Sequence, residues 1–307
     1  MSLVSIFNRA SKSVTSLREG LRECNLDYLA KKVPAYARNT AGELVEAPET
    51  FLLATSQGRV LKGSVGADYR VAQHRDVLDI ADSLQDAGVA RVARIGAYGA
   101  NGVFAVLSLP GVTEVAVGDN VAANVILVSR HGIGSNFGLV VRERLYCSNQ
   151  IPSLLAKGRA FRFQHSGDIS AKLAFATAKI SVAADATREE SEIWRRLAGT
   201  RVTLIEARAL IAKWVAPEGD IDAVRGGRAV AATVEGLFDH GTGNHGATHW
   251  DVLNGITEYL DHSRARYARS AASAQRLVQS SLEGDTGEKR ERALRLLATH
   301  AGIEVSR

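Results

Sequence analysis

Hydrophobic patterning changes character near residue 168 of this 307-residue chain. Before that point, short apolar runs are separated by glycine-rich loops. One run, residues 125–128, is apolar without interruption, as is typical of a strand covered on both faces. After it, apolar residues recur at helical spacing. The sequence therefore predicts an α+β fold, in which residues 1–167 form a mixed or antiparallel sheet with helices and residues 168–307 form a helical region packed on it. The two parts are either separate domains or one continuous domain.

The strand-rich part is expected to begin with a helix over residues 14–32 and to continue with a hairpin over residues 51–65 that turns at residues 56–58. Residues 73–88 predict an amphipathic helix, because their apolar side chains recur on one face and Gly88 follows the last of them. Further strands are expected at residues 89–95, 103–107 and 125–128, and further helices at about residues 169–198, 202–214, 250–278 and 288–300.

Cysteine usage and hydropathy indicate the compartment. Cys24 and Cys147 are far apart and flanked by apolar residues, which is typical of reduced, buried thiols and not of a disulfide framework. The apolar stretch at the N-terminus is too short for a secretory signal, and no window is long enough to span a membrane. We therefore expect a cytoplasmic protein without a membrane partner. The net charge of +5 permits a polyanionic partner without requiring one.

A basic and aromatic stripe runs through residues 137–166. Side chains alternate between the two faces of a strand, so Arg142, Arg144 and Tyr146 are expected to share one face, opposite an apolar face. Lys157, Arg159 and Arg162 continue the basic character and are interleaved with Phe161 and Phe163. Such a pattern favours a nucleic-acid site, because cations follow the phosphates while aromatic rings stack on bases. The alternative is a solvated sheet face with the phenylalanines in the core.

A second basic cluster lies on the expected helix over residues 250–278. If that helix is unbroken, Arg266, Arg269 and Arg276 fall within about 80° of one another. They could contact phosphates or a second copy of the chain. The alternative is the ordinary solvent face of an amphipathic helix.

The histidines suggest metal binding only weakly. His245 and His249 have i,i+4 spacing, but the surrounding glycines predict a loop, so we expect neither a metal nor a cofactor. Glu258 and His262 predict a structural ion pair or hydrogen bond or, alternatively, a general acid/base pair.

Two further polar positions favour structural roles. His74 falls on the apolar side of its helix and is expected in the core. Asp168 is expected to cap the helix that follows it.

Four phrases of the sequence together resemble the phage/plasmid-like protein family, a bacterial and phage domain family of unknown function. The phrases are VGADYRVAQHRDVLDIADSL, RERLYCSNQIPSLL, FRFQHSGDISAKLAFA and THWDVLNGITEYLDH, with matches at Arg144, Cys147, Asn149, Leu154, His165, Gly167, Trp250, Asn254, Thr257, Glu258, Tyr259, Asp261 and His262. The chain departs from the family at His74, where asparagine is usual. It also departs in the turn Ser129-Arg130-His131-Gly132, where the family has serine-histidine-aspartate-glycine.

The resemblance implies a mobile genetic element of bacteria, such as a phage, prophage or plasmid, and implies no established activity. Genes of this kind look like accessories to replication or recombination. The order of hairpins followed by a helix is also similar, as a fold-level analogy, to Rad-type single-strand annealing proteins.

Two main function classes follow. The first is a non-catalytic nucleic-acid-binding protein that binds or anneals single-stranded DNA as a homo-oligomer in the bacterial cytoplasm. The alternative is a histidine/carboxylate-dependent hydrolase or nuclease. A third class is an interaction protein directed against host defence. The sequence has no nucleophile elbow and no Walker loop, which favours the non-catalytic class over an enzyme.

Overall fold

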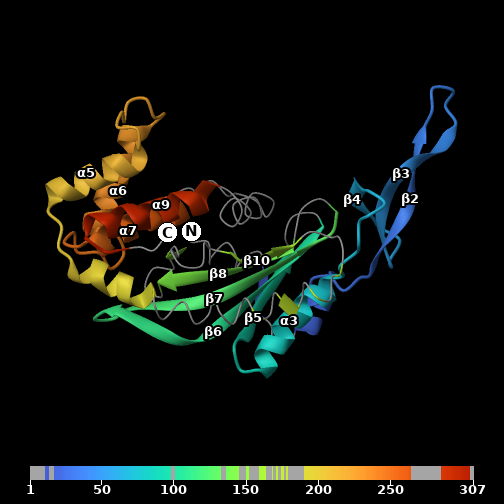
Figure 1. Ribbon diagram of the computed structural model, residues 1–307, viewed down its shortest axis with the longest axis horizontal. Helices are drawn as coiled ribbons and strands as arrows, with labels where there is room; N and C mark the ends of the chain where they lie inside the picture. Colours follow the sequence, from blue (N-terminus) through green and yellow to red (C-terminus); the bar gives the residue numbers. More distant parts are fainter. Residues whose placement is uncertain are drawn as a thin grey trace.

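The computed structural model describes residues 11–13, 17–97, 101–132, 136–144, 150–151, 159–163, 168, 171, 174–175, 178, 190–263 and 285–304. Its described strands form two antiparallel sheets, and helices follow them in the chain (Figure 1). This order confirms the predicted α+β class.

The larger sheet contains seven of the described strands in the order β1-β5-β6-β7-β8-β10, and β9 pairs with β8. Every pairing is antiparallel. The strands are β1 (Ser11–Ser13), β5 (Arg91–Ala97), β6 (Gly102–Ala116), β7 (Asp119–Arg130), β8 (Asn136–Arg144), β9 (Gln150–Ile151) and β10 (Arg159–Phe163). The smaller sheet has the order β2 (Ala30–Arg38), β3 (Leu44–Thr55) and β4 (Val60–Val65).

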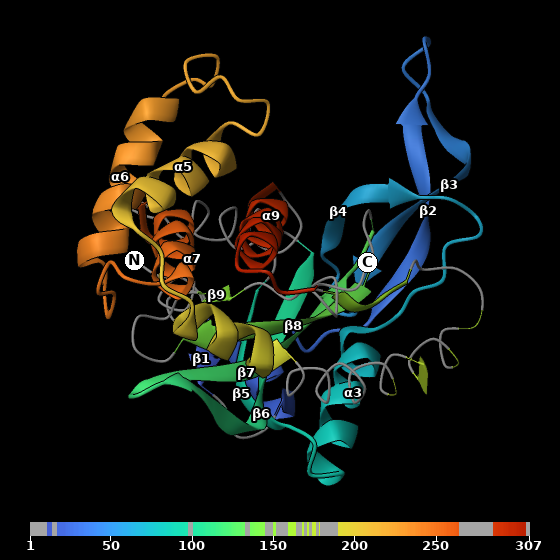
Figure 2. The same cartoon turned by 60° about the vertical axis from the view of Figure 1, so that its left-hand side comes forward.

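Helices lie on both sides of the larger sheet (Figure 2). The helices are α2 (Leu17–Glu23), α3 (His74–Asp86), α5 (Leu204–Val215), α6 (Gly227–His240), α7 (His249–Glu258), the π-helix η1 (Tyr259–Ser263) and α9 (Asp285–His300). Residues 190–199 are also mainly helical. In both views α3 lies against one face of the sheet, while α7 and α9 lie on the opposite side. Among the described helices, none has the length and apolarity to cross a membrane.

Two hydrophobic cores result from this arrangement. In the first, apolar side chains of α2 and α3 pack on the sheet, where alternate residues of β6 and β7 such as Ala105, Leu107 and Val125 are fully buried. The second lies within the helical region, and Val115 and Val121 from the β6–β7 hairpin belong to it. The hairpin therefore connects the sheet to the helices.

Several local predictions are confirmed. The hairpin over residues 51–65 turns where expected, with Gly58 at a φ of 80°. The predicted amphipathic helix corresponds to α3, and Gly88 follows it at a φ of 69°. The apolar run 125–128 lies in β7 beside β8, with Val125 opposite Val140.

The predicted helix over residues 14–32 is wrong beyond its first part. Helix α2 ends at Glu23, and Asn25 then adopts a φ of 54°, which a helix cannot accommodate. From Ala30 onward the chain is a strand, because it pairs with β3 from Ala30 opposite Thr55. Pairing with a distant segment thus outweighs the local helical pattern.

The expected helix over residues 250–278 changes its hydrogen-bond pattern partway. It is α-helical to Glu258 and continues as a π-helix to Ser263, after which residues 264–284 lie outside the described part. The last helix begins at Asp285, three residues earlier than predicted. The backbone N–H of Ala171 donates to Asp168 Oδ1 at 3.1 Å, the contact expected of a helix cap.

Candidate functional site

The predicted basic stripe falls on neighbouring strands. Strand β8 carries Arg142 and Arg144, which lie opposite Ala123 and Val121 of β7. Strand β10 carries Arg159, opposite Leu139 of β8. Tyr146, Lys157, Arg266, Arg269 and Arg276 lie outside the described residues.

Arg162, also on β10, lies opposite Phe137. Four of the predicted cations, Arg142, Arg144, Arg159 and Arg162, therefore stand at backbone positions on two paired strands. Their assignment to a nucleic-acid site stays a prediction.

A buried polar group lies where the two sheets meet, and we call it the histidine cluster: Tyr28, His74, Ser129 and His131. None of these four side chains is more than 3% exposed. The Tyr28 hydroxyl lies 3.2 Å from His74 Nε2, and His74 Nδ1 lies 2.8 Å from the Ser129 hydroxyl. The rings of His74 and His131 are 4.0 Å apart between centroids.

Electrostatics set the protonation of the phenols around this cluster. Burial raises the pKa of Tyr28, and the guanidinium of Arg59, 5.2 Å from the ring centroid, opposes the rise. Burial raises the pKa of Tyr69 to about 12, although its hydroxyl accepts a hydrogen bond from the N–H of Gly132 at 2.9 Å. Tyr28 therefore keeps its proton near neutral pH and can donate it to His74 Nε2. Nδ1 then donates to Ser129.

The histidine cluster connects three parts of the fold. Tyr28 precedes β2, His74 begins α3, and Ser129 lies at the end of β7. Beside it, the Gln73 side chain both donates to and accepts from the backbone of Ala30 at 2.9 Å. The cluster thus fixes the base of the smaller sheet against the larger one.

Sequence reasoning found only part of this cluster. The prediction that His74 is a core histidine is confirmed, since it is 1% exposed. The contacts with Tyr28, Ser129 and His131 were not predicted. The only signal was that His74 and the turn containing His131 are the two positions where the chain departs from the family it resembles.

The two histidines considered for metal binding do not form a pair with each other. His249 is 2% exposed, and its Nε2 lies 2.9 Å from Nδ1 of His300, while its Nδ1 lies 3.0 Å from the carbonyl oxygen of Thr200. His245 is exposed. Burial lowers the pKa of His249, and the neighbouring His300 lowers it further. Within the described part of the chain, no three His, Cys, Asp or Glu side chains are placed to hold a metal ion.

Polar residues of the family phrase on α7 and η1 make contacts within the helical region. Asp261 forms an ion pair with Arg290 of α9, and both side chains are almost completely buried. Asp251 accepts from the hydroxyl and the N–H of Thr248, which caps α7. Glu258 accepts a hydrogen bond from the N–H of Thr242 at 3.1 Å. These contacts hold α7 in the helical region, and they favour the structural role for Glu258.

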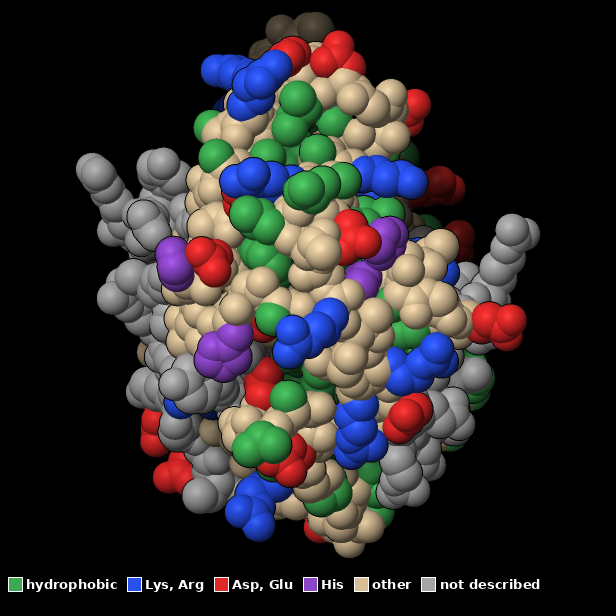
Figure 3. All heavy atoms as spheres, turned by 90° about the vertical axis from the view of Figure 1, so that its left-hand side faces the viewer, with side chains coloured by type: hydrophobic (Ala, Val, Ile, Leu, Met, Phe, Trp, Pro, Cys, Tyr) green, Lys and Arg blue, Asp and Glu red, His purple; other side chains and the backbone are tan. Residues whose placement is uncertain are grey.

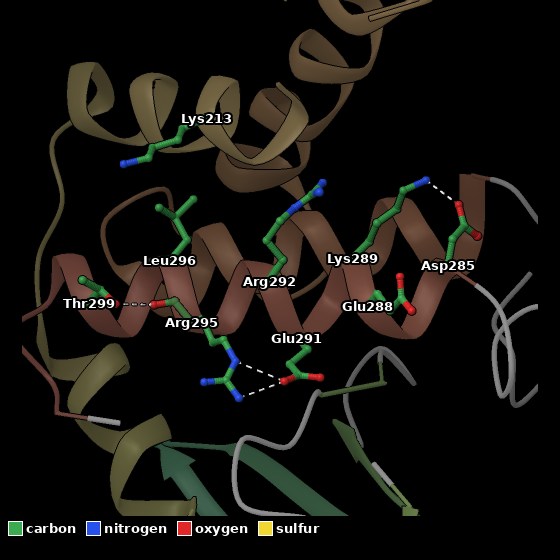
Figure 4. Close-up of a pocket in the computed structure, with 9 residues that line it drawn as sticks. All are labelled: Lys213, Asp285, Glu288, Lys289, Glu291, Arg292, Arg295, Leu296 and Thr299. Atoms are coloured by element: carbon green, nitrogen blue, oxygen red, sulfur yellow. Dashed lines mark hydrogen bonds and ion pairs between the residues drawn. The ribbon is translucent and has the colours of Figure 1, made fainter. Parts of the chain in front are cut away.

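A groove of about 710 Å³ lies between α5 and α9 (Figure 4). Its lining mixes both signs of charge: Lys213, Asp285, Glu288, Lys289, Glu291, Arg292 and Arg295, together with Leu296 and Thr299. Arg292 donates to the carbonyl oxygen of Trp214 at 2.8 Å, and the Trp214 indole donates to that of Lys289 at 3.0 Å. The charges nearly cancel, so the groove does not favour a polyanion.

The helical end of the molecule is also mixed in charge. Figure 3 shows lysine and arginine side chains dispersed among acidic and histidine side chains on this face. Arg208 pairs with Glu235, and Arg228 pairs with Asp222. This face therefore offers no patch of a single sign among its described residues.

Comparison with known proteins places the chain in one family. The family described as domain of unknown function (DUF932) matches residues 62–290, and the chain belongs to it. No curated protein and no solved structure matches the chain.

Proposed function

We propose that this member of the DUF932 family is a nucleic-acid-binding accessory protein of a phage, prophage or plasmid, which binds or anneals single strands during recombination or replication. The observation that carries the proposal is the pairing of β8 with β10. It supports the proposal because cations that are separated in sequence stand on adjacent strands of one sheet. Paired strands are about 4.8 Å apart.

The predicted cations are spread along the two strands. Arg162 stands opposite Phe137, and Arg144 lies seven residues further along β8. At about 3.4 Å per residue, the predicted cations would extend over roughly 24 Å of the sheet. By strand alternation, Arg142 and Arg144 stand at positions of one face of β8, whereas Phe137 and Leu139, the partners of Arg162 and Arg159, stand at positions of the other face. The two pairs of cations therefore offer separate contacts to a phosphate backbone, and base stacking by Tyr146 would favour single strands.

The test is the salt dependence of binding, measured by fluorescence anisotropy with labelled single-stranded and double-stranded oligonucleotides. Five phosphate contacts, from Arg142, Arg144, Lys157, Arg159 and Arg162, predict a slope of log affinity against log salt of about −3 to −4, at roughly −0.7 per contact. Replacing Arg142 and Arg144 together with glutamine should flatten the slope by about one to one and a half units. Absence of any affinity at about 50 mM salt would refute the proposal and leave the enzyme and host-interaction classes.

A matched control and a stacking variant make the test specific. Arg208 and Arg228 are exposed cations that pair with carboxylates elsewhere in the fold. Their joint replacement with glutamine should leave the slope unchanged. Tyr146→Ala should cost roughly 1–3 kcal/mol of binding with almost no change in slope, because stacking releases no counterions.

One contact in the structure resembles what a hydrolase would need. Ser129 and His74 are in hydrogen-bonding contact, as a nucleophile and its base would be. However, Ser129 is completely buried, and the group on the other side of His74 is the phenol of Tyr28. A substrate could not reach that hydroxyl in this conformation, so we assign the histidine cluster a structural role.

A further inference from the structure

The smaller sheet ends in a two-stranded ribbon that points away from the body of the protein (Figures 1 and 2). We call residues 36–46 the distal ribbon. Within it Tyr36 lies opposite Glu46, and Arg38 lies opposite Leu44. A large bulge separates it from the rest of the sheet, because the register moves from Pro34 opposite Phe51 directly to Tyr36 opposite Glu46.

The distal ribbon is exposed on both faces. Every residue in it except Asn39 is exposed, and its apolar side chains are open to solvent: Tyr36 at 56%, Leu44 at 62% and Val45 at 41%. Tyr36 and Leu44 lie on one face and Val45 on the other, as strand alternation requires. A two-stranded ribbon without a covering layer is marginally stable in water. A partner that covers these side chains would therefore stabilise it.

Protection of the strand edges stops where the distal ribbon begins. Lys31, Lys32 and Pro34 lie on β2 before the bulge, and Pro48 lies on β3 within it. Lysine and proline on an edge strand disfavour pairing with another chain. The paired stretches 36–38 and 44–46 contain neither residue. Among the described strands, β4 pairs with β3 only between Phe51 and Ala54, so the distal edges of the ribbon stay open to a partner strand or loop.

Charge identifies which partner fits. The distal ribbon contains one cation, Arg38, and two anions, Glu43 and Glu46, for a net charge of −1. The chain as a whole has +5, so the remainder of the chain carries +6. This balance disfavours a phosphate backbone as the partner of the distal ribbon and favours the basic body of a second copy. Because the distal ribbon points away from its own body, it reaches such a surface only on another molecule.

We infer that the distal ribbon is an oligomerisation arm that docks on the body of a second copy of this chain. The inference specifies the contact of the expected homo-oligomer and does not depend on nucleic-acid binding. Contact between an arm and a different surface is heterologous, so repetition gives a closed ring or a filament unless two copies exchange arms reciprocally.

The test is the molar mass of the full chain, measured by size-exclusion chromatography with light scattering. The wild type should be larger than one chain of 32.8 kDa. Changing Tyr36, Leu44 and Val45 together to serine should weaken assembly at least about tenfold and release monomers, because it removes the apolar contact. Circular dichroism should show the same secondary structure for the variant and the wild type, because the distal ribbon lies apart from both cores.

Controls address apolar exposure and charge separately. Val117 is fully exposed at the tip of the β6–β7 hairpin, and Ile205 is 79% exposed on α5, so Val117→Ser/Ile205→Ser is a matched control that should assemble as the wild type does. Glu43→Lys/Glu46→Lys leaves the apolar side chains in place but changes the charge of the distal ribbon from −1 to +3. It should weaken assembly, and added salt should then strengthen assembly, because salt screens a repulsion in place of an attraction.

Three results would overturn the inference: a monomeric wild type, an unchanged mass in the triple serine variant, or equal dissociation of the matched control. Binding to single strands is measured on the same samples. Loss of assembly with retained binding, or assembly without any binding, separates this inference from the proposed function.

Discussion

The indole N–H of Trp250 donates a hydrogen bond to Oδ2 of Asp119 at 2.7 Å, across 131 positions of sequence. Asp119 begins β7 at the tip of the β6–β7 hairpin, and Trp250 lies in the first turn of α7. Both are buried. Together with Val115 and Val121, this bond attaches the hairpin of the larger sheet to the core of the helical region.

Removing that bond should destabilise the whole chain. Trp250→Phe keeps an aromatic ring but loses the donor to a buried carboxylate, which should cost about 1–3 kcal/mol in urea unfolding. Asp119→Ala, which removes the acceptor, and the double variant complete a cycle. A coupling energy of about 0.5 kcal/mol or more is expected for residues in contact. A coupling near zero would mean that packing alone attaches the hairpin to the helices.

Loss of one partner from the buried ion pair between Asp261 and Arg290 should destabilise the fold far more than loss of one partner from an exposed pair. Arg290→Met leaves a buried carboxylate without its cation, and we expect a loss of about 3–5 kcal/mol in the free energy of unfolding. The control is the pair of Asp285 and Lys289 on the same helix, whose side chains are 54% and 34% exposed. Lys289→Met should cost about 0–1 kcal/mol. Equal losses from both variants would contradict the prediction that the buried pair contributes more to stability than the exposed pair.

The histidine cluster should behave as one unit. Ser129→Ala and Tyr28→Phe each remove one partner of His74, and each should cost about 1–3 kcal/mol. Because both bonds involve the same imidazole, the loss of unfolding free energy in the double variant should differ measurably from the sum of the losses in the two single variants. Tyr36→Phe, on the exposed distal ribbon, is the control and should stay within about 0.5 kcal/mol of the wild type. Strict additivity would show that the two contacts are independent.

Sequence patterns predicted those elements whose local and tertiary preferences agree. Helix α3 was predictable because its apolar face, its first turn and the following Gly88 all indicate the same structure. Strand β2 was not, because residues up to Lys32 continue a helical pattern while the native partner of Ala30 is Thr55 on another strand. Local periodicity contains no information about such a partner.

The same limit applies to the candidate sites. The basic stripe was visible in the sequence because its residues are close together there. The pairing of β10 with β8, which brings Arg159 and Arg162 beside β8, could not be predicted from the sequence pattern. His74 and His131 are 57 positions apart and meet only because α3 packs at the end of β7. Contacts of this kind depend on topology, which hydrophobic patterns do not determine.

The stability of the fold should decrease below about pH 6.5 through His249. Burial and the neighbouring His300 lower the pKa of His249 from its ordinary value of 6.5, while the contact with Thr200 opposes this. Between the lowered pKa and 6.5, the unfolded chain binds a proton at this residue that the folded chain does not. The contribution of the neutral His249 imidazole to the free energy of unfolding is therefore complete above pH 6.5. It is lost as the pH falls towards the lowered pKa, and below that pKa the free energy of unfolding no longer changes through this residue. Urea unfolding between about pH 7.5 and pH 5 measures the slope. His249→Gln should reduce that slope, and His245→Gln, at an exposed position of the loop that precedes α7, should leave it unchanged. An identical slope in wild type and His249→Gln would show that another group is responsible for the acid sensitivity.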